Sequence, residues 1–405
     1  MSDHEMDVAD VDEVRFARVA LSLLAEPGTR AVYRLASRYG AVDALRMALD
    51  GEIPDEAARD AVRARLRDGD PRSKAEAALA TGQRLGARLV TPEDDDWPPR
   101  LAALERISLP GGDRRVDREL APPLCIWARG DWPLADALDR SVAIVGARAA
   151  TQYGEHVANN LAYGLAEREW TIVSGGAYGI DAAAHRGALG AGGLTVAVFA
   201  CGIERSYPVV NSALFDRIAE SGLLITEWPP GAEPFRPRFL IRNRVIAAAT
   251  RGTILVEASA RSGAMQTMRR AIALDRRAMV VPGPVTSAMS VGCHEMLRSH
   301  DSARVVASVD HVLEEVGLIG TDLAPLARGP RQARDQLDDE STFLLESMPR
   351  RGAIGVDALA ARAAVDVRTA LRKLGLLETL GFVVRRSGGY ALAPPNRKPR
   401  DDGRP

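Results

Sequence analysis

Apolar and polar positions follow two alternating periods along the middle of the chain. Short apolar runs near residues 142–145, 171–173, 195–199, 223–226, 253–256 and 279–281 are separated by stretches with helical spacing, such as Val157, Leu161 and Leu165. This alternation predicts buried parallel strands joined by crossover helices. We therefore predict an α/β fold, an extended Rossmann-like and mostly parallel sheet with helices on both faces. Ligands of such sheets bind beyond the carboxyl ends of the strands.

The pattern changes on both sides of this region. Apolar residues at helical spacing, broken at Pro27-Gly28 and Gly40, predict a small helical domain before it, and a run from Leu124 to Ala128 predicts an added edge strand. Three helical stretches and two alternating strands around a Gly-Gly turn near the C-terminus predict a winged helix. The predicted organisation is a disordered tail over 1–10, a helical domain over 11–87, the Rossmann-like domain over 88–317, a linker over 318–339, the winged helix over 340–393 and a disordered tail over 394–405.

The composition says more about the cellular environment of the protein than about the reaction or ligand. The 405 residues carry a formal net charge of −1, so an anion-binding role must depend on local patches of charge. The three cysteines, Cys125, Cys201 and Cys293, are far apart and have no metal-ligand spacing. Together with the absence of a signal peptide and of a long apolar run, they predict a cytoplasmic protein without a membrane segment.

Three turns between a predicted strand and a predicted helix have the residues that receive phosphate oxygens. They are Gly146-Ala-Arg148 after the first strand, Ser174-Gly175 after the second, and Ser262-Gly263 after the fifth. Backbone N–H groups at a helix N-terminus attract anions, although a glycine there can equally serve to pack a helix on a strand. All three turns fall at the same edge of the predicted sheet, which favours a ligand site.

The segment WPPGAEPFRPRFLIRNR, from Trp228 to Arg244, interleaves arginines with aromatic residues. Guanidinium groups suit phosphates and rings suit bases, so this segment predicts contact with a strand of nucleotides. The alternative is a surface loop of salt bridges. Tyr207 is a second candidate for base stacking or for loop packing. The candidates in these loops are Tyr207, Phe235, Arg236, Arg238, Phe239, Arg242 and Arg244.

Common catalytic motifs are absent. There is no GxxxxGK[ST], intact GxGxxG, HExxH or nucleophile elbow, and no metal or cofactor site is expected. His185 is predicted to be structural. Asp181 and Glu257 could form an acid/base pair at the strand ends, but helix capping and arginine anchoring explain them equally well. The basic residues of the predicted winged helix leave both a DNA-reading and a protein-binding face open: Arg368, Arg372, Lys373, Arg385 and Arg386.

Taken together, seven segments resemble the DprA/Smf DNA-processing family. They are VGARAATQYG, VSGGAYGIDAAAHRGAL, the YPVVN turn, ITEWPPGAEPFRPRFLIRNRVIAA, ILVEASARSGAMQT, VVPGP and GCHEML. The flanking helical and winged-helix regions are similar to the SAM-like and winged-helix domains of that family. Two positions depart from the family pattern: Tyr178 replaces an expected arginine, and Ser212 an expected lysine.

The resemblance implies a non-enzymatic protein that binds single-stranded DNA, protects incoming strands, dimerises and helps to load the RecA recombinase in natural transformation. By position it implies DNA contacts from Gly146, Arg148, Ser174, Gly175, Arg242, Asn243, Arg244, Ser262 and Gly263, and dimerisation near Leu297. Tyr207 and Arg238 are added to the DNA contacts from the loop chemistry. The alternative is a nucleotide-processing enzyme of the lysine-decarboxylase-like phosphoribohydrolase type, with Glu257 as the acid.

Overall fold

A computed structural model describes residues 8–107, 120–317, 334 and 337–394. The chain divides into two compact units, Met1–Ala324 and Pro325–Pro405, which are described separately. Helix α1 begins at Val8, so residues 8–10 belong to a helix rather than to the predicted N-terminal tail. Nearly all of the predicted linker and of the C-terminal tail lies outside the described residues.

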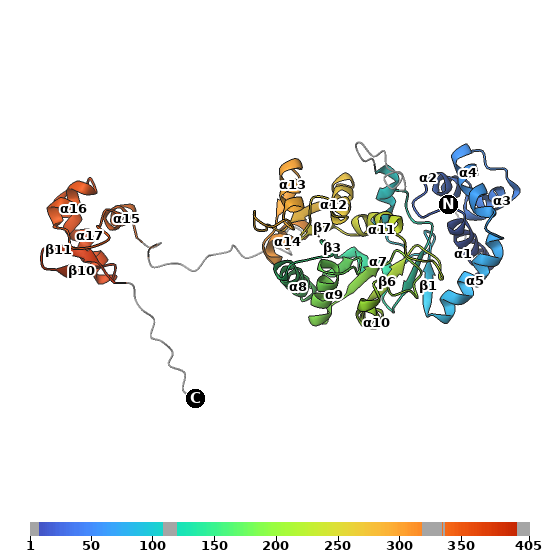
Figure 1. Cartoon of the computed structure of the whole chain (residues 1–405), viewed down its shortest axis with the longest axis horizontal. Coiled ribbons are helices and arrows are strands. Elements are labelled where there is room, and N and C mark those ends of the chain that lie inside the picture. The colour runs from blue at the N-terminus through green and yellow to red at the C-terminus, as the bar shows by residue number, and fades with distance from the viewer. Residues whose placement is uncertain (1–7, 108–119, 318–333, 335–336, 395–405) are drawn as a thin grey trace, which may run out of the picture. The chain divides into compact units, whose positions relative to one another are not determined.

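The first unit contains a nine-stranded sheet in the order β1-β2-β6-β5-β4-β3-β7-β8-β9 (Figure 1). Neighbouring strands from β6 to β9 are parallel, whereas β1 and β2 add antiparallel pairs at one edge. The chain moves outward from β3 through β4, β5 and β6 and then returns to β7 on the other side of β3. Such a reversal opens a crevice at the carboxyl ends of the strands. The strands are β1 (Ala87–Val90), β2 (Ile126–Arg129), β3 (Ser141–Val145), β4 (Thr171–Ser174), β5 (Thr195–Val198), β6 (Leu223–Thr226), β7 (Gly252–Leu255), β8 (Arg277–Val280) and β9 (Ala303–Val305).

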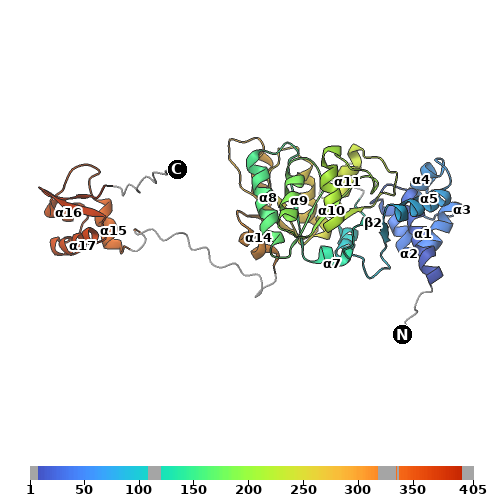
Figure 2. The ribbon, with the colours of Figure 1, turned by 90° about the horizontal axis from the view of Figure 1, so that it is seen from below.

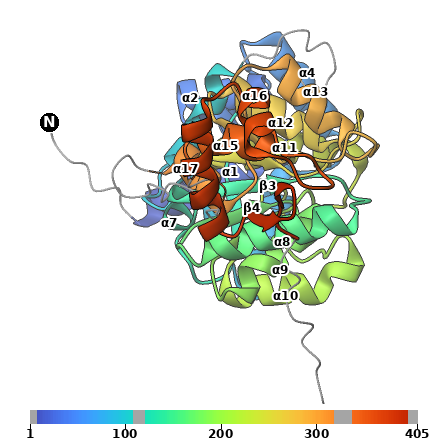
Figure 3. The same ribbon diagram turned by 90° about the vertical axis from the view of Figure 1, so that its left-hand side faces the viewer.

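Helices cover both faces of the sheet, because side chains alternate between the faces along each strand. In β3, Ala143 and Val145 lie in one buried cluster with α7, α11, α12 and α13, whereas Val142 and Ile144 lie in another with α8, α9 and α14. Figure 1 shows α11, α12 and α13 on one side of the strands and α8, α9 and α10 on the other. Figure 2 shows α8, α9 and α10 side by side, and Figure 3 shows the same two groups of helices from the end of the molecule. These helices are α7 (Leu134–Asp139), α8 (Gln152–Ala166), α9 (Ile180–Gly190), α10 (Ser212–Ser221), α11 (Arg236–Ala249), α12 (Ala264–Ala273), α13 (Val291–Ser299) and α14 (Val309–Val316).

Five N-terminal helices form a second core that continues onto the edge of the sheet. They are α1 (Val8–Leu23), α2 (Arg30–Tyr39), α3 (Ala41–Asp50), α4 (Glu56–Leu66) and α5 (Pro71–Arg84). Their buried cluster includes Cys125 and Trp127 from the β2 region. Gly82 of α5 lies against the Trp127 ring, where a Cβ atom would come within 2.3 Å of Cζ3. The helical region therefore packs directly on the sheet.

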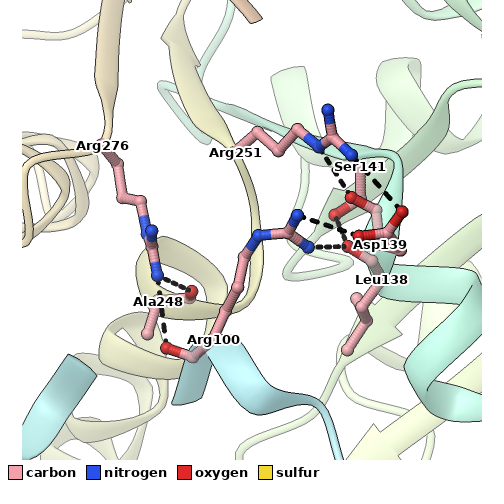
Figure 4. A network of polar contacts seen from close by, with 7 residues as sticks. All are labelled: Arg100, Leu138, Asp139, Ser141, Ala248, Arg251 and Arg276. Atoms are coloured by element: carbon pink, nitrogen blue, oxygen red, sulfur yellow. Dashed lines mark hydrogen bonds and ion pairs between the residues drawn. The ribbon is translucent and has the colours of Figure 1, made fainter. Parts of the chain in front are cut away.

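Arginines hold together the amino-terminal edge of the sheet, where β3, β7 and β8 begin (Figure 4). The Asp139 carboxylate accepts hydrogen bonds from Arg100 of the 3₁₀ helix η1 (Pro99–Arg106) at 2.9 Å and from Arg251 at 3.3 Å. Arg276 donates to the carbonyl oxygens of Arg100 and Ala248, each at 3.3 Å. These arginines connect η1, α7 and α11, so they serve packing at the edge opposite the crevice.

The second unit contains three helices followed by an antiparallel hairpin, the order predicted for the winged helix. The elements are α15 (Asp339–Glu346), α16 (Val356–Arg362), α17 (Val367–Thr379), β10 (Val383–Arg386) and β11 (Gly389–Leu392). Ile354 also pairs with Tyr390 of the hairpin. Leu344, Leu359 and Leu374 of the three helices lie in one buried core.

The predicted fold class is confirmed, and each predicted strand, including the edge strand near Leu124–Ala128, is found within one or two residues. Two strands, β1 and β9, were not predicted. Strand β9 is short, and two of its three residues are exposed, so it has no apolar run to reveal it. Strand β1 follows α5 closely and pairs only through β2, which is a long-range contact.

His185 of α9 lies in the interior as a neutral imidazole. Its Nδ1 atom is 2.7 Å from Thr195 Oγ1, and that hydroxyl donates to the carbonyl oxygen of Ile172. The imidazole Nδ1–H therefore donates to Thr195, and within the described part of the chain Nε2 has no hydrogen-bond partner. Burial, together with the charges of Arg242 and Arg186, lowers the pKa of His185 to about 3. This environment agrees with the predicted structural role.

The buried imidazole predicts acid sensitivity. Below pH 6.5 the unfolded chain binds a proton at His185 that the folded chain excludes until about pH 3, so stability falls as the pH falls. The loss through this residue is about 1.4 kcal/mol per pH unit. Urea denaturation between pH 7 and 5 should show a shallower loss for His185→Gln than for wild type. His156→Gln, at an exposed site on α8, should keep the wild-type slope, and an unchanged slope in His185→Gln would contradict the assignment.

Candidate nucleic-acid interface

A cleft of about 750 Å³ opens at the carboxyl edge of the sheet, at the reversal of chain order. Its walls come from the segments after β3, β4, β5, β6, β7 and β8 and from the first parts of α9, α11 and α12. Four arginines and one carboxylate, Asp181, are the charged residues of its lining. Residues that line it are Val145, Gly146, Ala147, Arg148, Ala149, Ala177, Asp181, Tyr207, Pro234, Phe235, Arg236, Phe239, Leu240, Arg242, Asn243, Ile246, Ser259, Arg261, Ser262, Gly263, Ala264, Gln266, Thr267 and Met289.

The turn after β3 is held against its neighbours by backbone contacts. Ala147 N–H donates to Glu257 O at 2.7 Å, and a Cβ atom at Gly146 would lie 2.5 Å from Ile180 Cγ1. Gly146 is therefore required for close packing of α9. The backbone N–H groups of Arg148 and Ala149 have no hydrogen-bond partner among the described residues, and both residues are exposed. This turn keeps donors available to an anion.

In the turn after β4, the polar groups of Ser174 and Gly175 form hydrogen bonds within the protein. Ser174 is fully buried, and its hydroxyl donates to Ile144 O at 2.6 Å. Gly175 N–H donates to Asp181 Oδ2 at 3.1 Å. A carboxylate of the chain itself thus occupies the position that the sequence assigned to a phosphate. Burial raises the pKa of Asp181, and the charge of Arg242 opposes that rise.

Arg242 forms the floor of the cleft. Its guanidinium donates to Val198 O at the end of β5 and to Asn243 Oδ1 at 3.1 Å. Both of its terminal nitrogens lie 2.3 Å from the position a Cβ atom would take at Gly175, so a larger residue there would displace the guanidinium. Burial lowers the pKa of Arg242 to about 10, and the group stays charged near neutral pH.

Arg244 lies outside the cleft. Two residues along a helix correspond to about 200° of rotation, so Arg242 and Arg244 point in nearly opposite directions. The side chain of Arg244 is fully buried and makes a bidentate ion pair with Glu227, at 2.8 and 2.6 Å. Its position does not fit the predicted DNA contact, because no surface of the side chain is available to a ligand.

Arg148 lies beside a pair of aromatic rings in the cleft. The Tyr207 and Phe239 ring centroids are 5.2 Å apart, and the Arg148 guanidinium lies 5.3 Å above the Phe239 ring. Tyr207 is 44% exposed and Phe235 is 43% exposed, which leaves ring surface for stacking. Asn211 Nδ2 donates to Gly176 O at 3.0 Å and so joins the Tyr207 turn to the turn after β4.

Arg236, at the start of α11, and Arg261, in the turn after β7, add exposed cations to the cleft lining. Neither makes an ion pair within the described ranges, and the same is true of Arg148. Gly263, the N-cap residue of α12, is exposed, and the Ser262 hydroxyl accepts a hydrogen bond from Ala264 N–H at 3.3 Å. The cleft therefore combines three available guanidinium groups with a helix N-terminus, a combination suited to a polyanion.

Glu257 does not have the environment of a catalytic acid. It is buried, does not line the cleft, and accepts hydrogen bonds from the backbone N–H and hydroxyl of Thr151, at 2.9 and 2.7 Å. Thr151 is the N-cap residue of α8. Glu257 was predicted either to act as an acid or to anchor a helix terminus or an arginine. This geometry fits the anchoring of a helix terminus, and it does not support Glu257 as the acid of the phosphoribohydrolase alternative.

Comparison with known proteins gives a consistent result. A family model for DNA recombination-mediator protein A matches residues 88–317. The chain is 42% identical over 382 residues to the putative DNA processing protein DprA of Mycobacterium tuberculosis, covering 94% of this chain and 95% of that protein. It is 30% identical over 325 residues to protein Smf of Escherichia coli, covering 79% and 81%.

The chain belongs to the DNA recombination-mediator protein A family.

A solved structure agrees with this assignment. The X-ray structure of DprA from Streptococcus pneumoniae superposes with a TM-score of 0.62 at 29% identity, covering 75% of this chain and 98% of that one. The resemblance to DprA/Smf proteins, first drawn from seven sequence segments, is thus confirmed.

The structure gathers most of the predicted DNA contacts of this family member but not all. Gly146, Arg148, Tyr207, Arg242, Asn243, Ser262 and Gly263 line the cleft. Ser174, Gly175, Arg238 and Arg244 do not. Phe235, Arg236 and Phe239, which are candidates from the arginine-rich segment, also line it, and so does Arg261, which the sequence analysis does not single out. Their signal was present, because they stand in the arginine-rich segment and in the turn before Ser262.

Outside the cleft, other predicted residues have mixed surroundings. Leu297 of α13 is half-buried against the main core, and its part in dimerisation stays a prediction. In the C-terminal unit Lys373 forms ion pairs with Asp338 and Glu340, and α17 exposes Leu376 as well as its arginines. This surface therefore still fits either DNA binding or protein binding, as predicted. The described residues contain no metal-binding cluster of His, Cys, Asp or Glu, and none of their helices is long and apolar enough to span a membrane.

The ion pair of Arg244 predicts a defect in folding rather than in binding. Arg244→Ala leaves a buried carboxylate without its partner, which costs about 3–5 kcal/mol. Burial raises the pKa of Glu227, and Arg244 opposes this rise, so the variant should have a still higher pKa. Relative to wild type, its deficit in urea denaturation should therefore grow as the pH rises above the pKa of Glu227 in the folded wild type, which is itself higher than the ordinary value of 4.5.

The double variant Arg244→Met/Glu227→Met, which removes both buried charges, should recover most of the lost stability. Wild-type stability of Arg244→Ala, combined with a loss of DNA affinity, would show instead that Arg244 contacts the ligand.

Proposed function

We propose that this chain is a non-enzymatic recombination mediator that binds single-stranded DNA in the cleft and protects it. The observation that carries the proposal is the juxtaposition of Arg148, Arg236 and Arg261, which have no ion-pair partner among the described residues, with the rings of Tyr207 and Phe235. Phosphates of a flexible strand can contact the guanidinium groups while unpaired bases stack on the rings. A duplex keeps its bases paired, so it cannot use the rings in this way.

Further parts of the proposal come from family membership and from the sequence. The chain acts in the cytoplasm as a homodimer, with Leu297 near the contact, and helps to load RecA onto the bound strand during natural transformation and recombination. Burial of Glu257 and its hydrogen bonds to Thr151 support a binding protein over the nucleotide-processing enzyme.

Binding can be tested by fluorescence anisotropy with a labelled oligonucleotide, single- and double-stranded, at two salt concentrations. Single strands should bind more tightly, with an affinity that falls as salt rises. Arg148→Ala should weaken binding roughly tenfold, the size expected for one charge-assisted contact. It should also reduce the slope of log affinity against log salt by about 0.7. Tyr207→Ala should weaken binding without changing that slope.

Arg277→Ala is the matched control, because Arg277 is an exposed arginine at the opposite edge of the sheet. It should bind as wild type does. Equal losses in Arg277→Ala and Arg148→Ala would place binding on the general surface charge and not in the cleft.

RecA loading has its own test. The chain should increase the rate of RecA ATP hydrolysis on single strands already coated with a single-strand-binding protein, and Arg148→Ala should lose this effect. Tight DNA binding without any increase would leave a strand-binding protein that is not a mediator.

A further inference from the structure

Glu26, in the turn after α1, joins the N-terminal helices to the loop that carries the cleft aromatics. Its Oε1 atom accepts from Arg65 at 2.6 Å and from Arg238 at 3.0 Å, and its Oε2 atom accepts from Trp228 Nε1 at 3.1 Å. The side chains of Glu26 and Arg238 are 11% and 12% exposed. This carboxylate is therefore nearly buried and has several polar partners, and solvent screening weakens its ion pairs only a little.

Arg238 connects this centre to the cleft. Its guanidinium lies 4.3 Å from the centroid of the Phe235 ring, and its Nη1 atom donates to Glu233 O at 2.7 Å. Phe235 is the N-cap residue of α11 and lines the cleft. Arg238, which the sequence assigned to DNA, thus contacts a ring that lines the cleft but does not line the cleft itself.

We propose that Glu26 is a positioning residue for nucleic-acid binding: it holds Arg238 against Phe235 and so fixes the ring for base stacking. The proposal rests on the proposed function of the cleft. It makes the N-terminal helices part of the binding site, although among the residues that line the cleft none comes from them.

Simple electrostatics leads to the opposite expectation for this residue. Burial acts to raise the pKa of Glu26, but the hydrogen bonds and charge of Arg238, with Trp228 and Arg65, outweigh it and hold the pKa below its usual value. Glu26 is therefore ionised, and removing a negative charge near a polyanion site should tighten binding. Removing a positioning residue should weaken it. The sign of the change separates the two effects.

The test is anisotropy titration of single-stranded DNA with the full chain and Glu26→Gln, which keeps the shape and removes the charge. We expect binding about 3- to 10-fold weaker, the effect of a base stack partly lost, with an unchanged salt slope. In a Phe235→Ala background, Glu26→Gln should change affinity by less than about twofold, because the ring it positions is already absent.

Glu93→Gln is the matched control. Glu93 pairs with Arg18 of α1 at 2.8 Å, so it also joins the helical region to the sheet, but it does not touch the cleft loop. This variant should bind normally. If Glu26→Gln fails to fold, Arg238→Gln, which removes the same contact from the other side, should show the same loss and the same dependence on Phe235.

Unchanged or tighter binding by Glu26→Gln overturns the positioning role. Tighter binding would mean that Glu26 instead neutralises the positive charge of Arg238. Equal effects of Glu26→Gln in the wild-type and Phe235→Ala backgrounds also overturn it. Absence of any binding by wild type is a different result, because it rejects the proposed function itself and with it this inference.

Discussion

The buried guanidinium of Arg242 connects the elements that form the floor of the cleft. It reaches from α11 to the carbonyl oxygen at the end of β5 and covers the backbone at Gly175 after β4. Taking a cation out of water costs free energy, and here a carbonyl oxygen and the nearby Asp181 carboxylate offset that cost. The turns after β4 and β5 and the start of α11 consequently depend on one charged group.

The arginines of the segment 228–244 divide into different roles because a helix distributes them around its axis. Arg242 lies beneath the cleft, Arg244 is paired inside the protein, and Arg238 reaches toward the N-terminal helices. Arg236 remains exposed at the cleft. The arginine-rich motif of this chain is therefore mostly structural, and the cations available to a polyanion come from the turn after β3, the first residue of α11 and the turn after β7.

Glycine and carboxylate positions show a similar division. Gly146 and Gly179 allow the turn after β3 to touch the start of α9, since a Cβ atom on Gly179 would lie 2.5 Å from Ala147 O. Asp181 then binds the N–H groups of the turn after β4. In the turn after β4 this carboxylate takes the N–H groups of Gly175 and Ala177, whereas those of Arg148 and Ala149 after β3 have no partner among the described residues. The difference comes from a side chain of the following helix, α9.

The order of strands and helices, the edge at which the site lies and most of its residues follow from the sequence alone, because strand length, helical period and turn chemistry are local properties. The segments that resemble the DprA/Smf family could be recognised for the same reason. The partners of Arg238 and Arg244 could not be foreseen, because Glu26 is 212 residues away from Arg238 in the chain. Burial and pairing of a charged side chain are set by elements that meet only in the folded protein. For this chain, local chemistry determined where the sequence predicts an anion site, and tertiary packing decided which arginines remain exposed there.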